Sequence, residues 1–153
     1  MAVYDKRRPK QAHYFEGIFQ LREPTEEVLN FIAAEFERNP DVWIAKEVKM
    51  PKGVDLYLSS QRFLRALGKK LNDHFFGIVK FSRKLHTKNQ LTSKSIYRVY
   101  VYFRPLKLKR GQILAIEGEE FEVLAFARQV SLKNVRTGKK SRMKVEEIER
   151  YIR

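Results

Sequence analysis

The sequence predicts an α+β protein, in which a β-α-β-β-α-β-β module precedes a small all-β module. Apolar residues recur at helical spacing in two segments, and they alternate with polar residues in the segments around these two. After Pro105 the alternating segments become shorter and no further helical pattern of that length occurs. With 153 residues, 43% of them hydrophobic, the chain is long enough for one ordinary domain or two small ones.

The first module is expected over residues 13–105, after a flexible basic arm at 1–12. Its expected elements, in chain order, are a strand (13–22), a helix (25–38), two short strands (42–49 and 54–58), a second helix, and a hairpin of two strands (77–85 and 95–104). Thr25 is predicted to cap the first helix, and either Ser59 or Ser60 the second. Gly17 marks a bulge or a close approach. This order is typical of ferredoxin-like or split-βαβ-like folds.

The second module is expected over residues 106–153, and its hydrophobic pattern is that of strands. Short strands are expected at 112–117, 121–127, 129–135 and 141–145, followed by a helical turn at 146–151. Ile148 and Ile152 would return the end of this turn to the core. Closely spaced short strands that end in a helical turn predict a small SH3-like β-barrel.

Positive charge is concentrated in one stretch, residues 74–110. This stretch has ten Lys or Arg residues and no Asp or Glu, so it supplies +10 of the net charge of +14. The flanks are nearly balanced, with 13 basic and 11 acidic residues before the stretch and 9 basic and 7 acidic residues after it. Segregated positive charge with interleaved aromatic residues is typical of a surface that contacts phosphate.

The hairpin inside this stretch should present two different faces. Val79, Phe81, Leu85, Tyr97, Val99, Val101 and Phe103 form the apolar face that we expect in the core. The other face is expected to expose cations around Tyr100 and Tyr102, whose rings can stack on unpaired bases. The predicted nucleic-acid-binding residues are Lys80, Arg83, Lys84, Lys88, Lys94, Arg98, Tyr100, Tyr102, Arg104, Lys107, Lys109 and Arg110. An extension of this site onto the second helix would include Arg62, Arg65, Lys69 and Lys70. The alternative is an ordinary solvated sheet face.

The sequence offers no pattern that indicates catalysis, a metal site or a cofactor. It has no cysteine, and its histidines (His13, His74 and His86) have no ligand spacing with one another or with a carboxylate. Glycine-rich phosphate loops and nucleophile elbows are absent from the sequence as well. No stretch reaches the ~18 apolar residues of a membrane span. We therefore expect a cytoplasmic monomer that is not an enzyme and has no membrane partner.

Five segments resemble one known family and occur in the same order: YFEGIFQLR (14–22), GVDLYLSSQ (53–61), VKFSRKL (79–85), Tyr97-Arg98 and LKRGQ (108–112). Over about residues 13–150 the chain resembles the archaeal branch of the NMD-three family, the export adaptors of the large ribosomal subunit. The resemblance implies the middle region of such a protein without its N-terminal zinc modules. It also implies contacts with ribosomal RNA and large-subunit ribosomal proteins.

The residues and the resemblance lead to the same functional hypothesis. The chain is expected to be a non-catalytic RNA-binding factor that associates with the large ribosomal subunit through the basic hairpin. One alternative is a protein–protein adaptor whose SH3-like barrel binds a peptide or protein partner. Another is an accessory to an RNA-modifying enzyme.

Overall fold

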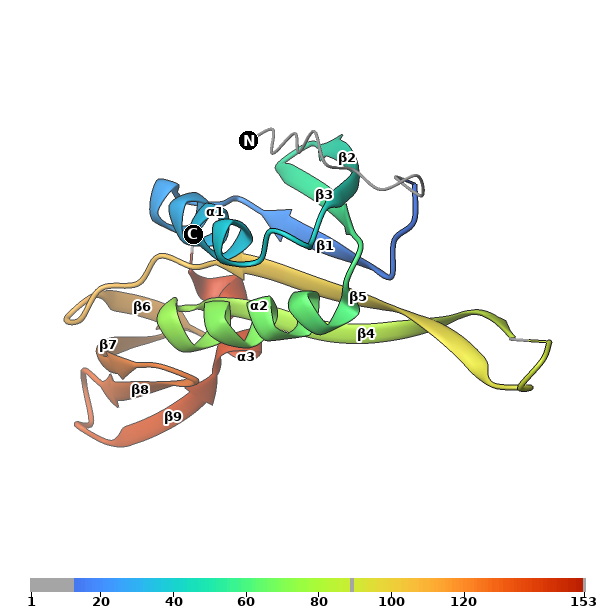
Figure 1. The fold of residues 1–153 in the computed structure, drawn as a ribbon. Helices are drawn as coiled ribbons and strands as arrows, with labels where there is room; N and C mark the ends of the chain where they lie inside the picture. The colour runs from blue at the N-terminus through green and yellow to red at the C-terminus, as the bar shows by residue number, and fades with distance from the viewer. Residues whose placement is uncertain (1–12, 89, 153) are drawn as a thin grey trace. The chain divides into compact units, whose positions relative to one another are not determined.

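The computed structural model describes residues 13–88 and 90–152 (Figure 1). The chain divides into two units, one over Met1–Phe75 and Val79–Arg104, the other over Phe76–Ile78 and Pro105–Arg153. The basic arm that the sequence predicts at 1–12 lies outside the described residues, as does Asn89 in the hairpin turn.

The first unit is built around one sheet and two helices. Its elements are β1 (Gly17–Arg22), α1 (Glu26–Arg38), β2 (Ile44–Met50), β3 (Gly53–Leu58), α2 (Gln61–His74) and most of β4 (Gly77–Lys88) and β5 (Ser95–Pro105). The sheet has five strands in the order β2-β3-β1-β5-β4. The predicted order of elements and the α+β class are therefore confirmed.

The sheet is mixed, because the second strand of the hairpin is the one that joins β1. β1 pairs antiparallel with β3, placing Phe19 opposite Leu56, and parallel with β5, placing Phe19 opposite Val101. β4 thus becomes an edge strand. Pairing with β1 ends at Val99 and Phe103, so the hairpin residues before Val99 in β5 extend beyond β1 (Figure 1).

Both helices cover the same face of this sheet (Figure 1). The buried cluster takes alternate residues from β1, β3 and β5 and one stripe from each helix, as the periodicity predicts. Its most buried members include Phe19, Leu21, Ile32, Leu56, Leu58, Leu64, Leu67, Leu71, Val101 and Phe103, all at most 1% exposed. Burying a large apolar side chain contributes roughly 1.5–3 kcal/mol, so this cluster supplies most of the stability of the unit.

Gly17 is a position of close approach, as its place in the first strand suggests. A Cβ there would lie 2.6 Å from Leu64 Cδ2 and 2.7 Å from the Val99 carbonyl oxygen. The absence of a side chain lets α2 pack on the sheet at the position where β1 and β5 start to pair. Of the two predicted interpretations, a bulge or a close approach, the structure supports the close approach.

Both α1 and α2 have a side-chain cap at the N-terminus. Thr25 Oγ1 accepts from the Val28 amide, which confirms the predicted cap of α1. For α2 the cap is Ser60, whose Oγ accepts from the Phe63 amide at 3.1 Å. The hydroxyl of Ser59 instead accepts from the Trp43 amide and joins the chain segments that flank β2 and α2.

A carboxylate from another segment supplements the cap of α2. Glu16 Oε1 accepts from the Gln61 amide at 2.9 Å, which places a negative charge at the positive end of the helix. The same carboxylate accepts from the Tyr14 hydroxyl at 2.6 Å. This hydrogen bond raises the pKa of Tyr14 to about 12. Since α2 has no acidic residue in its first turn, Glu16 takes the place of one.

The second unit contains a separate four-stranded antiparallel sheet. Its elements are β6 (Ile113–Ile116), β7 (Glu119–Phe126), β8 (Gln129–Asn134), β9 (Lys140–Lys144), α3 (Val145–Ile148) and a 3-10 turn (Glu149–Tyr151). Glu117 and Gly118 both have positive φ, as a tight two-residue hairpin turn between β6 and β7 requires. Ile148 is fully buried among Leu114, Val130 and Leu132, and Ile152 packs against this cluster, as predicted.

No helix in the described part of the chain is long and apolar enough to cross a membrane.

Candidate nucleic-acid interface

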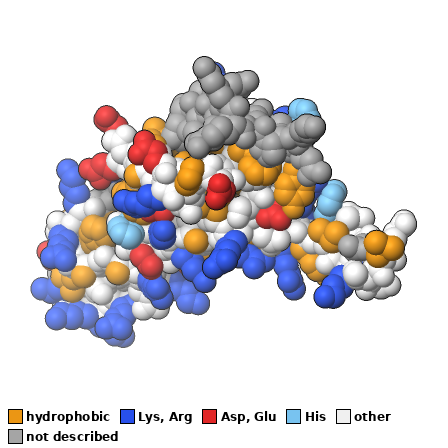
Figure 2. Space-filling model, viewed as in Figure 1, with side chains coloured by type: hydrophobic (Ala, Val, Ile, Leu, Met, Phe, Trp, Pro, Cys, Tyr) orange, Lys and Arg blue, Asp and Glu red, His pale blue; other side chains and the backbone are white. Residues whose placement is uncertain are grey.

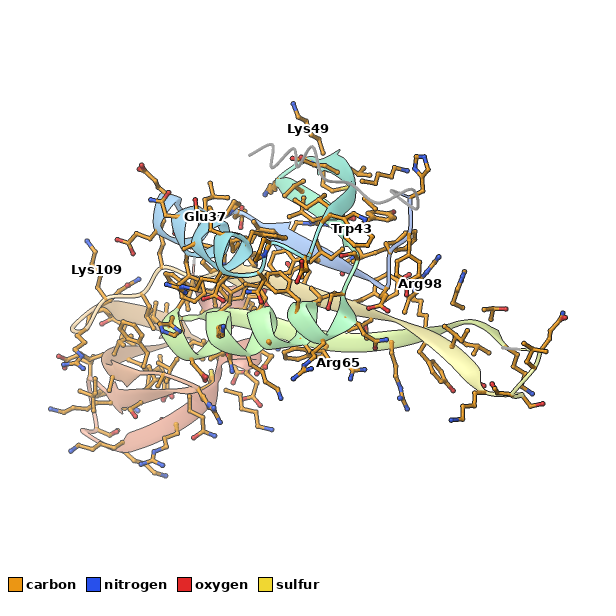
Figure 3. The ribbon with its side chains drawn as sticks, viewed as in Figure 1. Glu37, Trp43, Lys49, Arg65, Arg98 and Lys109 are labelled. Carbon is orange, nitrogen blue, oxygen red and sulfur yellow. The ribbon has the colours of Figure 1, made fainter. Side chains whose placement is uncertain are left out.

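The β4–β5 hairpin carries the densest group of predicted nucleic-acid-binding residues, and its two faces differ. Side chains alternate along each strand, so Lys80, Lys84, Tyr100 and Tyr102 lie on the face opposite the helices. In Figure 3, Arg98 lies on one side of the hairpin and Arg65, from α2, on the other. We refer to the face with Tyr100 and Tyr102 as the tyrosine face and to the opposite one as the helix face.

On the tyrosine face, each of two lysines lies over an aromatic ring. Lys80 Nζ is 5.6 Å from the centre of the Tyr102 ring, and Lys84 Nζ is 5.0 Å from the centre of the Tyr100 ring. Both lysines are exposed, and both rings are half-buried. The cation–π contacts hold the ammonium groups above the sheet at a small energetic gain, about 0.5–1 kcal/mol at exposed sites.

The two arginines of this face are held more firmly than the lysines. The Arg98 guanidinium stacks on Phe15, with 3.8 Å between its Cζ and the ring centre. Arg104 Nη1 lies 3.7 Å from Glu23 Oε2, and its side chain is 23% exposed. The sequence predicts that all four cations surround the tyrosines on an exposed face. In the structure the two lysines are exposed, whereas the two arginines are half-buried.

The helix face corrects one sequence expectation. Phe81, Leu85 and Tyr97 were expected in the core with Val99, yet they are 47%, 60% and 38% exposed. Only Val99, Val101 and Phe103 of β5 are buried as predicted. These three side chains are exposed because the hairpin is longer than the elements that pack on it. The apolar alternation continues into the part of the hairpin that extends beyond β1 and the helices.

The exposed aromatic residues of the helix face have cationic neighbours. Arg83 stacks on Tyr97, with 4.7 Å between the guanidinium carbon and the ring centre. Arg65 of α2 lies beside Arg83, since both line the same two hollows of the surface. Figure 2 shows Lys and Arg side chains gathered along this part of the first unit.

The row of cations predicted on α2 divides into two groups. Arg62, Arg65 and Lys69 are exposed and lie on the surface of the helix. Lys70 instead donates to the buried Glu35 of α1, with 2.7 Å between Nζ and Oε2. The hydrogen bond from Lys70 is the main reason that the pKa of Glu35 is lowered. Lys70 therefore has a structural partner that the other three cations do not share.

The remaining predicted residues lie at the hairpin tip and in the second unit. Lys88 and Lys94 flank the tip and are exposed. Lys107, Lys109 and Arg110 are also exposed, in the segment before β6 (Lys109 in Figure 3). This segment belongs to the second unit, so the structure brings together the hairpin cations and those of α2, but assigns these three to a different unit.

A basic sheet face in the second unit was missed by the sequence analysis. Lys133, Lys140, Arg142 and Lys144 share one face, because Lys133 pairs with Lys140 and Arg142 and Lys144 follow at alternate positions of β9. Figure 2 shows cationic side chains over these strands. The alternation KSRMK (140–144) was visible in the sequence. It lies outside the acid-free stretch, and for that reason it was not assigned to a site.

Within residues 13–88 and 90–152, no group of three or more His, Cys, Asp or Glu side chains is arranged to hold a metal ion.

A comparison with models of protein families matches the model described as "NMD3, second domain" over residues 14–104. A comparison with curated proteins found no match. The family match includes α2 and the hairpin as far as Arg104, and it extends over more than half of the 153 residues. It agrees with the resemblance found in the sequence segments between Tyr14 and Leu85. The chain belongs to the NMD3 family, and its residues 14–104 match the second domain of that family.

Proposed function

We propose that this chain is a non-catalytic RNA-binding factor that associates with the large ribosomal subunit through the β4–β5 hairpin. One observation carries the proposal. The hairpin extends beyond β1 and has no Asp or Glu in its sequence between Gly77 and Pro105, and it holds exposed lysines over half-buried tyrosines. Like charges that lie close together repel one another and destabilise the folded protein, and an anionic partner would offset this repulsion.

The tyrosine face suits RNA that contains unpaired nucleotides. Lys80 and Lys84 can leave their rings for phosphate oxygens at low cost, since an exposed cation–π contact is weak. The uncovered rings of Tyr100 and Tyr102 would then accept stacked bases. Arg98 and Arg104, held by Phe15 and Glu23, supply a fixed positive potential behind the two lysines.

Family membership supports the choice of the ribosome as the target. The NMD3 family is ribosome-related, so ribosomal RNA and large-subunit ribosomal proteins are the partners that we propose. We place this activity in the cytoplasm and assign it to a monomer. We propose that the protein acts by binding, because the described cations and tyrosines of the hairpin are suited to phosphate and base contacts.

Co-sedimentation with large ribosomal subunits over a range of salt concentrations tests this proposal. The chain should bind at low salt, and the logarithm of its affinity should fall linearly with the logarithm of the salt concentration. The variant K80A/K84A should bind more weakly, and its slope should be smaller by roughly 1.4–1.8, the value for two lost phosphate contacts.

The matched control is K140A/K144A, which removes the same charge from the basic sheet face of the second unit. An equal loss in both double variants would mean that net charge, rather than the hairpin, drives binding. Unchanged binding of K80A/K84A would contradict the proposal directly. Circular dichroism melting of each variant keeps a loss of folding from being mistaken for a loss of contact.

We also infer that the second unit is a small barrel of the SH3-like kind. Four antiparallel strands that end in a helical turn, with Ile148 inside the core, support this assignment. An experimental structure in which β6 and β9 remain far apart, with an open flat sheet, would argue against it.

A further inference from the structure

The helix face of the hairpin has a cavity with an apolar floor and a cationic rim. Its volume is about 310 Å³, and its lining residues are Arg65, Lys69, Phe81, Ser82, Arg83 and Val99. All of them belong to the first unit, from α2, β4 and β5. A volume of this size is at the lower end of the range found for small-ligand sites, roughly 300–1,000 Å³.

Phe81 forms the floor, and Gly68 holds the ring in place. A Cβ on Gly68 would lie 2.8 and 2.9 Å from two atoms of the Phe81 ring, so the helix backbone packs directly against the edge of that ring. The ring is nevertheless 47% exposed. It is therefore an aromatic platform that is fixed from one side and open from the other.

A second hollow adjoins the cavity and is more polar. Its volume is about 520 Å³, and its lining residues are Gln61, Arg65, Arg83, Thr92, Lys94, Ser95, Ile96 and Tyr97. Arg65 and Arg83 line both hollows and so stand at their junction. None of the described lining residues of either hollow is Asp or Glu, and the cations among them, Arg65, Lys69, Arg83 and Lys94, give both hollows a positive potential.

We propose that this cavity binds a single unpaired nucleotide of RNA, with its base on Phe81 and its phosphate between Arg65 and Arg83. This inference rests on the proposed function and adds a second contact on the face opposite the tyrosines. The next nucleotide along the strand would follow the second hollow towards Lys94.

The chemistry of the lining favours a nucleotide over other occupants. A nucleobase is flat and has a π-face that stacks on an aromatic ring, while its phosphates carry the negative charge that the rim needs. Guanidinium groups bind phosphate in a two-pronged geometry, and here two arginines stand beside the apolar floor. Ser82 at the wall can hydrogen-bond to the edge of a base. An uncharged apolar ligand would leave the cations without a partner.

The central test is the variant F81L, measured by fluorescence anisotropy with two probes. The first probe is a short single-stranded oligoadenylate, and the second is an oligomer of the same length with ribose and phosphate but no bases. Leucine keeps an apolar contact with Gly68 and removes the ring. Affinity for oligoadenylate should fall between about fivefold and about a hundredfold, the effect of one lost stack. Affinity for the base-free oligomer should not change.

Two control variants make the result specific to the cavity. L85A removes another exposed apolar side chain from the same face of β4, outside the cavity lining, and should bind both probes normally. R65A should lower the slope of log affinity against log salt by about 0.7, the value for one phosphate of a single strand. R62A, a substitution elsewhere on the exposed surface of α2, should change that slope by less.

The possible results separate this site from the proposed function. If K80A/K84A loses RNA binding while F81L binds oligoadenylate normally, the tyrosine face carries the function and the nucleotide site is wrong. If an acidic peptide containing phenylalanine competes with oligoadenylate for the wild type and F81L abolishes peptide binding alone, the cavity is a protein site. If the wild type binds neither probe nor the ribosomal subunit, both proposals fail.

Discussion

Glu35 and Lys70 join the two helices of the first unit, with 2.7 Å between Glu35 Oε2 and Lys70 Nζ. The Glu35 side chain is only 4% exposed, and its other oxygen accepts from Arg38 Nη1, also at 2.7 Å. A buried carboxylate needs such partners, because burial without them would strongly favour its neutral form. The pair therefore stabilises the helical layer that lies over the sheet and one side of the candidate interface.

Replacing Lys70 with Ala should destabilise the first unit by about 1–3 kcal/mol, because the buried Glu35 loses a charged hydrogen-bond donor. Urea unfolding at neutral pH measures the change. The control is K69A, the neighbouring exposed lysine, which should change the free energy of unfolding by at most about 0.5 kcal/mol. Equal stability of K70A and K69A would show that the ion pair contributes nothing in solution.

The contribution of Glu35 should also depend on pH in a defined direction. Its pKa is lowered in the folded protein from the ordinary value of 4.5, mainly by the hydrogen bond from Lys70. A lowered folded-state pKa contributes stability that is present above the unfolded value and is lost as the pH falls through the folded value. E35Q should therefore be less stable than the wild type at neutral pH, and the difference should shrink below about pH 4.5. A pH-independent difference would contradict this assignment.

Removal of the Ser60 hydroxyl should weaken the N-terminus of α2. The variant S60A loses the cap to the Phe63 amide and should lower the free energy of unfolding by about 1 kcal/mol. S95A, at an exposed position in β5, is the matched control and should be nearly neutral. Thermal melts of S60A and S95A measure the two losses of stability. A neutral S60A would mean that Glu16 alone satisfies this end of the helix.

The two sides of β5 should respond differently to truncation. Val101 is fully buried, so V101A should cost on the order of 2 kcal/mol through lost burial and a cavity. Ile96, on the same strand, is 42% exposed, and I96A should cost much less. Denaturant midpoints of the two variants provide the comparison. Similar losses would show that the outer hairpin is packed against something in solution.

Stacking of RNA bases on the tyrosine face of the hairpin can be tested separately. Y100L and Y102L should each weaken binding to single-stranded RNA by the worth of a stack, on the order of 1–3 kcal/mol, with little change in the salt dependence. Because Lys84 and Lys80 lie over these rings, each variant also frees a lysine that remains able to contact phosphate. Anisotropy titrations and melting curves are both needed. Lower stability with unchanged affinity would identify the rings as packing residues.

Much of the first unit was predictable because its signals are local. Helical spacing and capping residues identify α1 together with its Thr25 cap, and alternation identifies both strands of the hairpin and their two faces. Local patterns also identify Gly17 as either a bulge or a position of close approach, and the structure shows the second. The basic character of the hairpin is a matter of composition, and it depends on no tertiary contact at all.

Other features depend on tertiary contacts between segments that are far apart in the sequence. The sequence allowed Ser59 or Ser60 as the cap of α2, and only the position of the Trp43 amide separates their roles. Lys70 is indistinguishable from Lys69 in the sequence, yet only Lys70 faces the buried Glu35. A charge pattern along a helix cannot predict which cation meets a partner 35 residues away.

The sequence by itself determined the order of elements, the class of the fold and the segregation of positive charge, because propensity, periodicity and composition are properties of neighbouring residues. Tertiary structure alone decided that β5 rather than β4 joins β1, and therefore how far the hairpin extends beyond the helices. That length leaves Phe81 and Tyr97 exposed although they continue the apolar alternation of the core. Alternation specifies a face, whereas burial requires another element to cover that face, and α2 covers only part of it.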